Sequence, residues 1–162
     1  MEYHAVVRKI INILEGGKVW FEVFEHESVR TSEEAAKIRT GYSLKQGAKT
    51  IIIKAKTSSD LSSYFMLVLP GDKKFDSKKV KKALKIKDIR FATEVEVLLI
   101  TDGVQPGGVP PFGNIFGLQV IVDPTLIQNE RIIFNAGDRR CSIAMKTKDY
   151  VGMVKPTIES IV

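Results

Sequence analysis

Two neighbouring apolar runs, residues 48–55 and 64–69, constrain the fold of this chain more than any other feature of the sequence. Both runs are rich in β-branched and aliphatic residues, and only a polar turn at residues 57–60 separates them. The second run ends at Pro70-Gly71. Runs of this length and composition are typical of strands that lie in a protein core. The sequence therefore predicts two core strands that follow each other along the chain.

Helix and strand patterns alternate on both sides of these runs. Apolar residues at helical spacing predict a helix over residues 3–14, and Thr31 and Thr93 each precede a glutamate at capping-box spacing. Further helices are predicted over residues 32–39, from Asp76 or Ser77 onward, over 93–100 and 124–127, and over 148–154 with Thr147 as cap. Further strands are predicted at residues 19–24, 118–122, 131–135 and 140–145, with a hairpin turn at 136–138. This interspersed order predicts one compact α/β domain over residues 1–162, the length of an ordinary domain.

Several protein classes conflict with the composition. Hydrophobic residues make up 44% and charged residues 27%, which excludes a disordered polyelectrolyte. No apolar run approaches the roughly 18 residues that span a bilayer, and the charged first segment predicts an amphipathic helix, not a signal peptide. Cys141 is the one cysteine, so an intrachain disulfide and a cysteine-based zinc site are excluded. We expect a cytoplasmic protein with no membrane contact, metal or cofactor.

The net charge of +6 comes from one segment of the chain. Residues 73–90, here called the basic segment, hold eight lysines and one arginine against two aspartates, whereas the remaining residues are close to neutral. Six lysines at the start of this segment are candidates for contacts with phosphate groups: Lys73, Lys74, Lys78, Lys79, Lys81 and Lys82. The alternative is that these lysines form only the solvated face of a helix whose apolar residues are buried.

Residues for conventional catalysis are sparse. The two histidines, His4 and His26, are not paired with other ligand-type residues at metal spacing, and both are expected at the surface. Cys141 is expected to pack in a strand. No glycine-rich loop carries the lysine and hydroxyl residue of a phosphate-binding P-loop. The sequence therefore offers no triad, no metal site and no obvious protein base.

Lys49 and a long loop are the remaining candidates for a site. Lys49 lies at the start of the first core strand, on the face of Ile51 and Ile53, where an ammonium group needs a partner, a ligand or a path to solvent. The loop, residues 101–117, contains five glycines and three prolines. Such a loop can direct backbone N–H groups at an anionic or developing oxyanion group, or it can be a plain surface connection.

These residues together resemble the YbaK/prolyl-tRNA synthetase editing-domain family over roughly residues 24–154. The motifs that carry the resemblance are His26, Thr31-Ser32-Glu33-Glu34-Ala35-Ala36, Lys49-Thr50-Ile51, Pro70-Gly71-Asp72, Gly107-Gly108-Val109-Pro110-Pro111-Phe112-Gly113, Asp123 and Ala136-Gly137. The resemblance implies a mixed, mainly antiparallel sheet flanked by helices, with a pocket between the strand of Lys49 and residues 107–111 of the 101–117 loop, here called the glycine loop. It also implies a free-standing deacylase that hydrolyses the ester of mischarged tRNA, assisted by the ribose hydroxyl of the substrate.

Roles for individual residues follow from the same resemblance. Lys49 would hold the terminal phosphate, and Gly107, Gly108 and Val109 would position the ester through backbone contacts, so these four are the expected catalytic residues. The expected substrate-binding residues are His26, Thr50, Pro110, Pro111, Phe112, Gly113 and Gly137. The substrate would be a small amino acid such as alanine or cysteine on a proline tRNA. The partners would be the aminoacyl-tRNA end and an aminoacyl-tRNA synthetase, with the protein a monomer or weak dimer.

Two positions depart from the family pattern. Pro110 stands where the family has a loop serine, and proline supplies neither a hydroxyl nor an N–H donor. Asp102-Gly103-Val104 stands where Thr-Gly-Tyr is common. These departures leave open a non-catalytic tRNA-binding or regulatory protein of the same fold, and beyond it a small-metabolite binding module.

Overall fold

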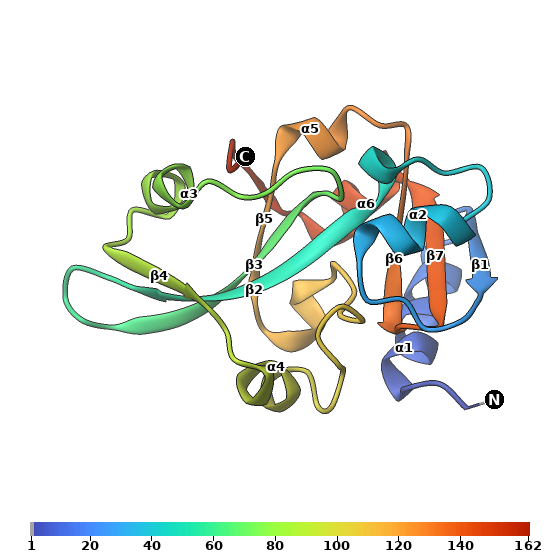
Figure 1. The fold of residues 1–162 in the computed structure, drawn as a ribbon, viewed down its shortest axis with the longest axis horizontal. Coiled ribbons are helices and arrows are strands. Elements are labelled where there is room, and N and C mark those ends of the chain that lie inside the picture. The colour runs from blue at the N-terminus through green and yellow to red at the C-terminus, as the bar shows by residue number, and fades with distance from the viewer. Residues whose placement is uncertain (1) are drawn as a thin grey trace.

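The strands of this protein divide between two sheets. The computed structural model describes residues 2–162 (Figure 1). The α-helices are α1 (Ala5–Gly16), α2 (Ser32–Ile38), α3 (Ser77–Leu84), α4 (Glu94–Ile100), α5 (Pro124–Ile127) and α6 (Thr147–Val154). The strands are β1 (Phe21–Glu25), β2 (Ala48–Lys56), β3 (Ser62–Pro70), β4 (Asp88–Phe91), β5 (Gln119–Val122), β6 (Arg131–Asp138), β7 (Cys141–Lys146) and β8 (Thr157–Ile158). Short 3₁₀ helices cover Leu44–Gln46 and Gly113–Phe116.

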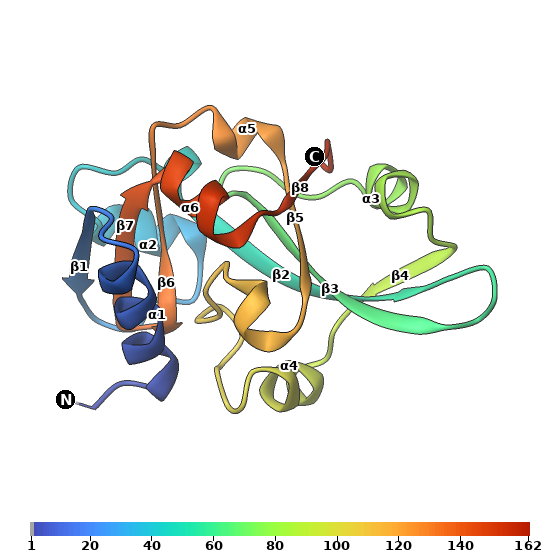
Figure 2. The same ribbon diagram turned by 180° about the vertical axis from the view of Figure 1, so that it is seen from behind.

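The predicted fold class is confirmed, with two sheets in place of the one expected. One sheet has the order β1-β7-β6 and is antiparallel, and the other has the order β4-β2-β3-β5-β8. The second sheet is mixed, because β5 runs parallel to β3 and β8 parallel to β5, whereas the β2 pairs are antiparallel. Figure 2, from behind, shows α1 and α6 against these sheets on the side opposite α2. Within residues 2–162, no helix is long and apolar enough to cross a membrane.

The two predicted core strands form the longest hairpin of the molecule. β2 and β3 pair from Ala48↔Pro70 to Lys56↔Ser62. In Figure 1 this hairpin extends well beyond the three-stranded sheet, with α3 and α4 on opposite sides of it. β4 pairs with β2 only along Ile53–Lys56, so the first half of β2 has an open edge on that side. The site described below lies at this edge.

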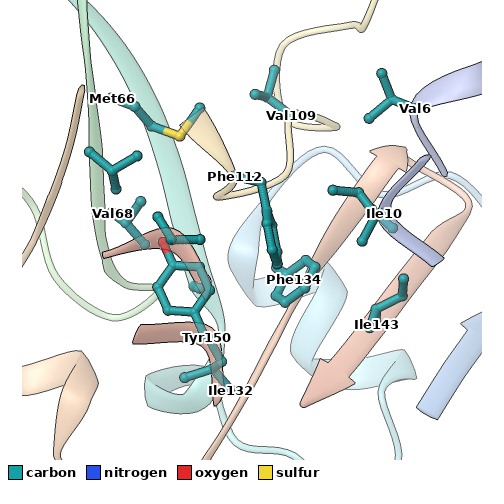
Figure 3. Packing of buried hydrophobic residues seen from close by; sticks show 14 of the residues in the cluster. Val6, Ile10, Met66, Val68, Val109, Phe112, Ile132, Phe134, Ile143 and Tyr150 are labelled. Atoms are coloured by element: carbon teal, nitrogen blue, oxygen red, sulfur yellow. The ribbon is translucent and has the colours of Figure 1, made fainter. Parts of the chain in front are cut away.

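Both faces of the hairpin are buried, which explains its continuous apolar runs. On one face Ile52, Met66 and Val68 belong to the main core. On the other face Ile53, Leu67 and Leu69 pack in a second cluster with Val80 of α3. The main core also contains Phe112 of the long loop, which lies against Phe134 and Tyr150 with ring centroids 5.6 Å apart in both pairs (Figure 3).

Three local predictions were wrong. No hairpin turn forms at residues 136–138, because β6 continues to Asp138 through a bulge and the turn follows at Arg139. Thr147 is not a cap; Lys146 precedes the helix, and the Thr147 hydroxyl donates a hydrogen bond to the Asn129 carbonyl at 2.5 Å. His4 precedes α1 instead of lying on it, and its Nδ1 accepts the N–H of Val6 at 3.1 Å.

β4 and β8 were not predicted. β4 begins at the end of the basic segment and is only four residues long, and β8 is only two residues long.

Candidate active site

A pocket of about 320 Å³ opens beside the free edge of β2. Its walls come from α2 and the residues around it, from the first residues of β2, and from the glycine loop. The volume is at the lower end of the range of small-molecule sites in proteins. Of the residues predicted from sequence, four line this pocket: Lys49, Thr50, Gly107 and Val109. These four residues therefore come together where β2 faces the loop.

Helix α2 is fixed in place at its first turn. The hydroxyl of Thr31 accepts a hydrogen bond from the N–H of Glu34 at 3.0 Å, as the sequence pattern predicts. The Glu34 carboxylate, however, accepts the N–H of Arg30 at 2.9 Å, so the reciprocal bond of a capping box goes to a neighbouring residue. This arrangement places Glu33 at the pocket wall, where it is the one carboxylate-bearing residue of the described lining.

Lys49 is partly buried at the start of β2. Its ammonium group donates a hydrogen bond to the carbonyl of Lys73, the first residue of the basic segment. Burial lowers the pKa of Lys49, and the negative charge of nearby Glu33 opposes that shift. The lysine thus reaches a partner while it lines the pocket, and it joins the site to the basic segment.

Thr50 presents unused polar groups at the open edge. The N–H of Ala92 donates to the carbonyl of Ile52 at 3.0 Å, so the backbone groups of Ile52 point away from β3. Backbone groups of every second residue in a strand point the same way, so the N–H and carbonyl of Thr50 also point away from β3. β4 does not extend to Thr50 on that side. The hydroxyl oxygen of Thr50 is buried and has no hydrogen-bond partner within residues 2–162. Because most buried polar groups have a partner, this oxygen is the unsatisfied side-chain group of the described site, at a residue that lines the pocket.

The glycine loop is held in place mainly through its carbonyl groups. Asn135 donates to the carbonyl of Gly107 at 2.5 Å, and Arg139 donates through Nε to the carbonyl of Pro106 at 2.8 Å. Gly107 has φ +88°, a conformation that favours glycine. The N–H groups of Gly107 and Val109 make no hydrogen bond to any residue of the described chain. Both residues line the pocket, so these two unbonded N–H groups are candidates for contact with a ligand.

The rest of the loop lies behind the pocket wall. Tyr150 donates its hydroxyl hydrogen to the carbonyl of Pro111 at 2.6 Å, and Phe112 is fully buried. Figure 3 shows Phe112 and Val109 directed into the core from the loop. At Gly113 a side chain would collide with Val120, since a Cβ there would be 2.5 Å from its methyl group. Pro110, Pro111, Phe112 and Gly113 are thus not part of the pocket lining; they anchor and shape the loop.

Three other predicted residues also lie outside this lining. Gly108 and Gly137 face a separate hollow beside His4 and Arg140. His26 makes a 2.7 Å hydrogen bond through Nε2 to the hydroxyl of Ser142.

Sequence reasoning missed Arg39, which follows the last residue of α2. Its side chain is 6% exposed and lines the pocket. Its Nε donates to the hydroxyl of Ser142 at 3.0 Å and its Nη2 donates to Oδ1 of Asn135 at 2.8 Å. Burial lowers the pKa of Arg39 to about 10, so the guanidinium is still charged at neutral pH. The available signal was its position four residues after the buried Ala35, on the inner face of the helix.

The lysines of the basic segment lie on and before α3. Asp76 begins this helix by accepting the N–H of Lys78 at 2.9 Å, as predicted. Five of the six candidate lysines are exposed and Lys81 is partly buried. Lys79 donates to the carbonyl of Val162 at 2.5 Å. The segment therefore presents a surface with a large excess of positive charge, which begins beside the pocket at Lys73 and continues to α3, away from α2 (Figure 1).

Comparisons with known proteins agree with the resemblance drawn from the motifs. Residues 26–153 match the family model for the aminoacyl-tRNA editing domain. A multifunctional Ser/Thr-tRNA deacylase, ProXp-y, from Escherichia coli K12 is 30% identical over 152 residues, which cover 93% of this chain and 89% of that protein. A proline–tRNA ligase from Ralstonia pickettii is 27% identical over 113 residues, or 70% of this chain and 20% of the ligase.

A solved structure described as a candidate trans-editing enzyme for prolyl tRNA synthetase has the same fold. It superposes with a TM-score of 0.81 at 22% identity, and the match covers 99% of this chain and 98% of the solved one.

The segment that matches the family model, residues 26–153, contains Lys49, the glycine loop and every pocket wall described above. The chain belongs to the aminoacyl-tRNA editing domain family.

Proposed function

We propose that this protein hydrolyses, in trans, the ester bond of tRNA that carries the wrong small amino acid. The observation that carries the proposal is the convergence in one pocket of Lys49, the buried hydroxyl of Thr50 and the free N–H groups of Gly107 and Val109. A cation, a polar side chain and two backbone donors are the groups that an aminoacyl ester next to a phosphate requires.

Each group has a role in this reaction. Lys49 binds the phosphate of the terminal adenosine as a point charge. The N–H groups of Gly107 and Val109 bind the ester carbonyl oxygen, whose negative charge increases in the tetrahedral intermediate. Glu33, the carboxylate of the described lining, receives the α-ammonium group of the amino acid.

The attacking water is assisted by the ribose hydroxyl of the substrate. The described pocket lining contains neither histidine nor cysteine, which supports a mechanism that does not use a protein base of that kind. Aminoacyl esters are labile, so positioning and backbone electrostatics supply enough of the rate increase.

The pocket volume supports a small amino acid. The sequence suggests alanine or cysteine on a proline tRNA, whereas the similar Escherichia coli protein is named a Ser/Thr-tRNA deacylase. The unpartnered hydroxyl of Thr50 supports a substrate side chain that forms a hydrogen bond. We therefore include serine and threonine with alanine and cysteine as candidate substrates.

Docking of the tRNA on the basic segment is part of the same proposal. Lys49 contacts the carbonyl of Lys73, so RNA that leaves the pocket past Lys49 reaches the start of the basic segment first and the lysines of α3 farther along it (Figure 1). A cytoplasmic protein that acts as a monomer or weak dimer beside an aminoacyl-tRNA synthetase completes the proposal.

The test is a deacylation panel with alanyl-, cysteinyl-, seryl- and threonyl-tRNA, each on its own tRNA and on proline tRNA. We expect hydrolysis of at least one, and a loss of roughly 100-fold or more in kcat/KM for Lys49→Ala, the range for a lost charged contact. Lys9→Ala, an exposed lysine on α1, is the matched control and keeps full activity. Equal rates for Lys49→Ala and the wild type would overturn the assignment of Lys49.

One observation favours a second function, a non-catalytic tRNA-binding protein. Pro110 removes an N–H donor from the loop at a position where the family pattern has serine. A wild-type protein that binds tRNA and hydrolyses none of the panel would select this function.

A further inference from the structure

The guanidinium of Arg39 is buried at the pocket without a carboxylate partner. It is 6% exposed, and no acidic group of the described chain lies within ion-pair distance of it. Removing a charge from water without an opposite charge is costly, and folding alone gives no reason to retain it. Ser142 and Asn135, its two hydrogen-bond partners, are both neutral. The charge of the Arg39 guanidinium is therefore available to a negatively charged group of a ligand that enters the pocket.

Three of the five hydrogen-bond donors of the Arg39 guanidinium have no partner in the described chain. A guanidinium carries five N–H donors in a fixed plane. One on Nε serves Ser142 and one on Nη2 serves Asn135, so both donors of Nη1 and one of Nη2 have no partner within residues 2–162. Because Arg39 lines the pocket, these donors are next to the space that a ligand fills.

Asn135 connects Arg39 to the glycine loop. Its Oδ1 accepts the N–H of Arg39 at 2.8 Å, and its Nδ2 donates to the carbonyl of Gly107 at 2.5 Å. Arg39 thus fixes which end of the Asn135 amide faces the loop. Only this one side chain separates the guanidinium from the backbone that carries the free N–H groups of Gly107 and Val109.

We propose that Arg39 binds the carbonyl oxygen of the scissile ester as it becomes an oxyanion, together with the loop N–H groups. Arg39 then supplies the donor that Pro110 cannot. The proposal rests on the deacylase function and names a substrate contact within it.

The chemistry leaves Arg39 unchanged. The water oxygen forms a bond to the ester carbon, the carbonyl π electrons move to the carbonyl oxygen, and the proton lost by the water passes to the ribose hydroxyl network of the substrate. The bond from carbon to the ribose oxygen then breaks, and that oxygen takes a proton to leave as a hydroxyl. Arg39 donates hydrogen bonds throughout and transfers no proton.

The first experiment measures kcat and KM of Arg39→Gln and Arg39→Lys on the best aminoacyl-tRNA of the panel. We expect kcat to fall roughly 100- to 1,000-fold, the range for one lost oxyanion donor, with KM changed less than about threefold. Arg39→Lys keeps the charge but not the planar fork, so we expect it to restore little of the rate. Arg8→Gln, an exposed arginine on α1, is the matched control. A kcat within threefold of wild type in both Arg39 variants would overturn the proposal.

The second experiment separates oxyanion binding from support of the fold. Calorimetry compares two adenosine analogues, one with a tetrahedral anionic phosphonate at the ester position and one with a planar neutral amide. We expect Arg39→Gln to weaken phosphonate binding about 100-fold and amide binding less than about threefold. An equal loss for both analogues means that Arg39 only supports the pocket.

The two analogues also separate this proposal from the proposed function. A wild type that hydrolyses no aminoacyl-tRNA contradicts the deacylase function, whereas the analogue comparison still decides whether Arg39 binds an anionic oxygen.

Discussion

The pocket and the basic segment hold positive charge in opposite ways. Arg39 is almost fully buried and fixed by Asn135 and Ser142, and Lys49 is fixed by the carbonyl of Lys73. The lysines of the basic segment are mostly exposed, and in the described structure Arg90 alone among its cations lies within ion-pair distance of an aspartate or glutamate side chain. A fixed buried charge acts on one atom of a ligand, whereas exposed lysines act on a polyanion at a distance.

Stability and binding therefore depend on different features in the two regions. Buried residues anchor the loop that forms the pocket, so substitutions of these residues change the free energy of unfolding as well as catalysis. Binding by the basic segment depends on the number of its charges, so a single substitution there changes stability and binding only slightly.

The largest effect is expected at the buried anchor of the loop. Phe112→Ala removes a fully buried ring that packs on Phe134 and Tyr150, and we expect the free energy of unfolding to fall by about 3–5 kcal/mol. Urea denaturation measures it. Leu99→Ala, at a residue that is 79% exposed on α4, is the control and changes stability by less than about 0.5 kcal/mol. Similar values for the two variants would mean that the loop is not anchored by the core.

The sequence predicted the parts of the fold that local pattern determines. The β2–β3 hairpin follows from apolar runs, and the starts of α2, α3 and α4 follow from side chains that accept backbone N–H groups in the first turn. The sequence predicts a turn at residues 136–138 where the structure has a bulge, and the glycine there, at φ +117°, suits either feature. Tertiary packing decides between them, since a side chain there would touch Val6 of α1.

The motifs predicted which residues lie near the site, but not which of them line the pocket and which are buried behind it. Lys49, Thr50, Gly107 and Val109 come together as the motif order suggests. Phe112 and Gly113 belong to the same motif, yet burial places them behind the wall. A motif marks residues that are needed together and does not say which of them meets the ligand.

A smaller effect on stability is expected from the other anchor of the loop. Tyr150→Phe removes the hydroxyl that donates to the carbonyl of Pro111 and leaves that carbonyl buried without its partner. We expect a loss of about 1–3 kcal/mol in the free energy of unfolding. We also expect faster amide exchange in the loop than in the wild type, measured by hydrogen exchange. Exchange in β1, far from this bond, is the internal reference, and an unchanged loop would show that Phe112 alone holds it.

The basic segment is tested by binding, where we expect a still smaller effect. Replacing Lys78, Lys79, Lys81 and Lys82 with glutamine weakens tRNA binding about tenfold at low salt and lowers the slope of log affinity against log salt by about 2–3, because fewer counterions are released. Filter binding across a salt series measures both. The control replaces Lys9, Lys18, Lys148 and Lys155, which are exposed outside the segment. Equal slopes of log affinity against log salt for the two variants would show that the basic segment does not bind tRNA and serves only solubility.

The smallest effect concerns Arg90, the cation of the basic segment that pairs with a glutamate side chain. The guanidinium of Arg90, 2.7 Å from Glu96, holds the pKa of that carboxyl well below its usual range, and the N–H of Thr93 and the hydroxyl of Tyr64 act in the same direction. A lowered folded-state pKa contributes stability that is present above the unfolded pKa, about 4.3, and is lost as the pH falls below it. Glu96→Gln should therefore reduce the rise in stability between pH 3 and pH 6, measured by urea denaturation at each pH. Glu94→Gln, an exposed neighbour on α4, should leave that rise unchanged. If Glu96→Gln has the wild-type pH dependence, the pairing of Arg90 contributes nothing, and the whole basic segment then behaves as the unpaired lysines do.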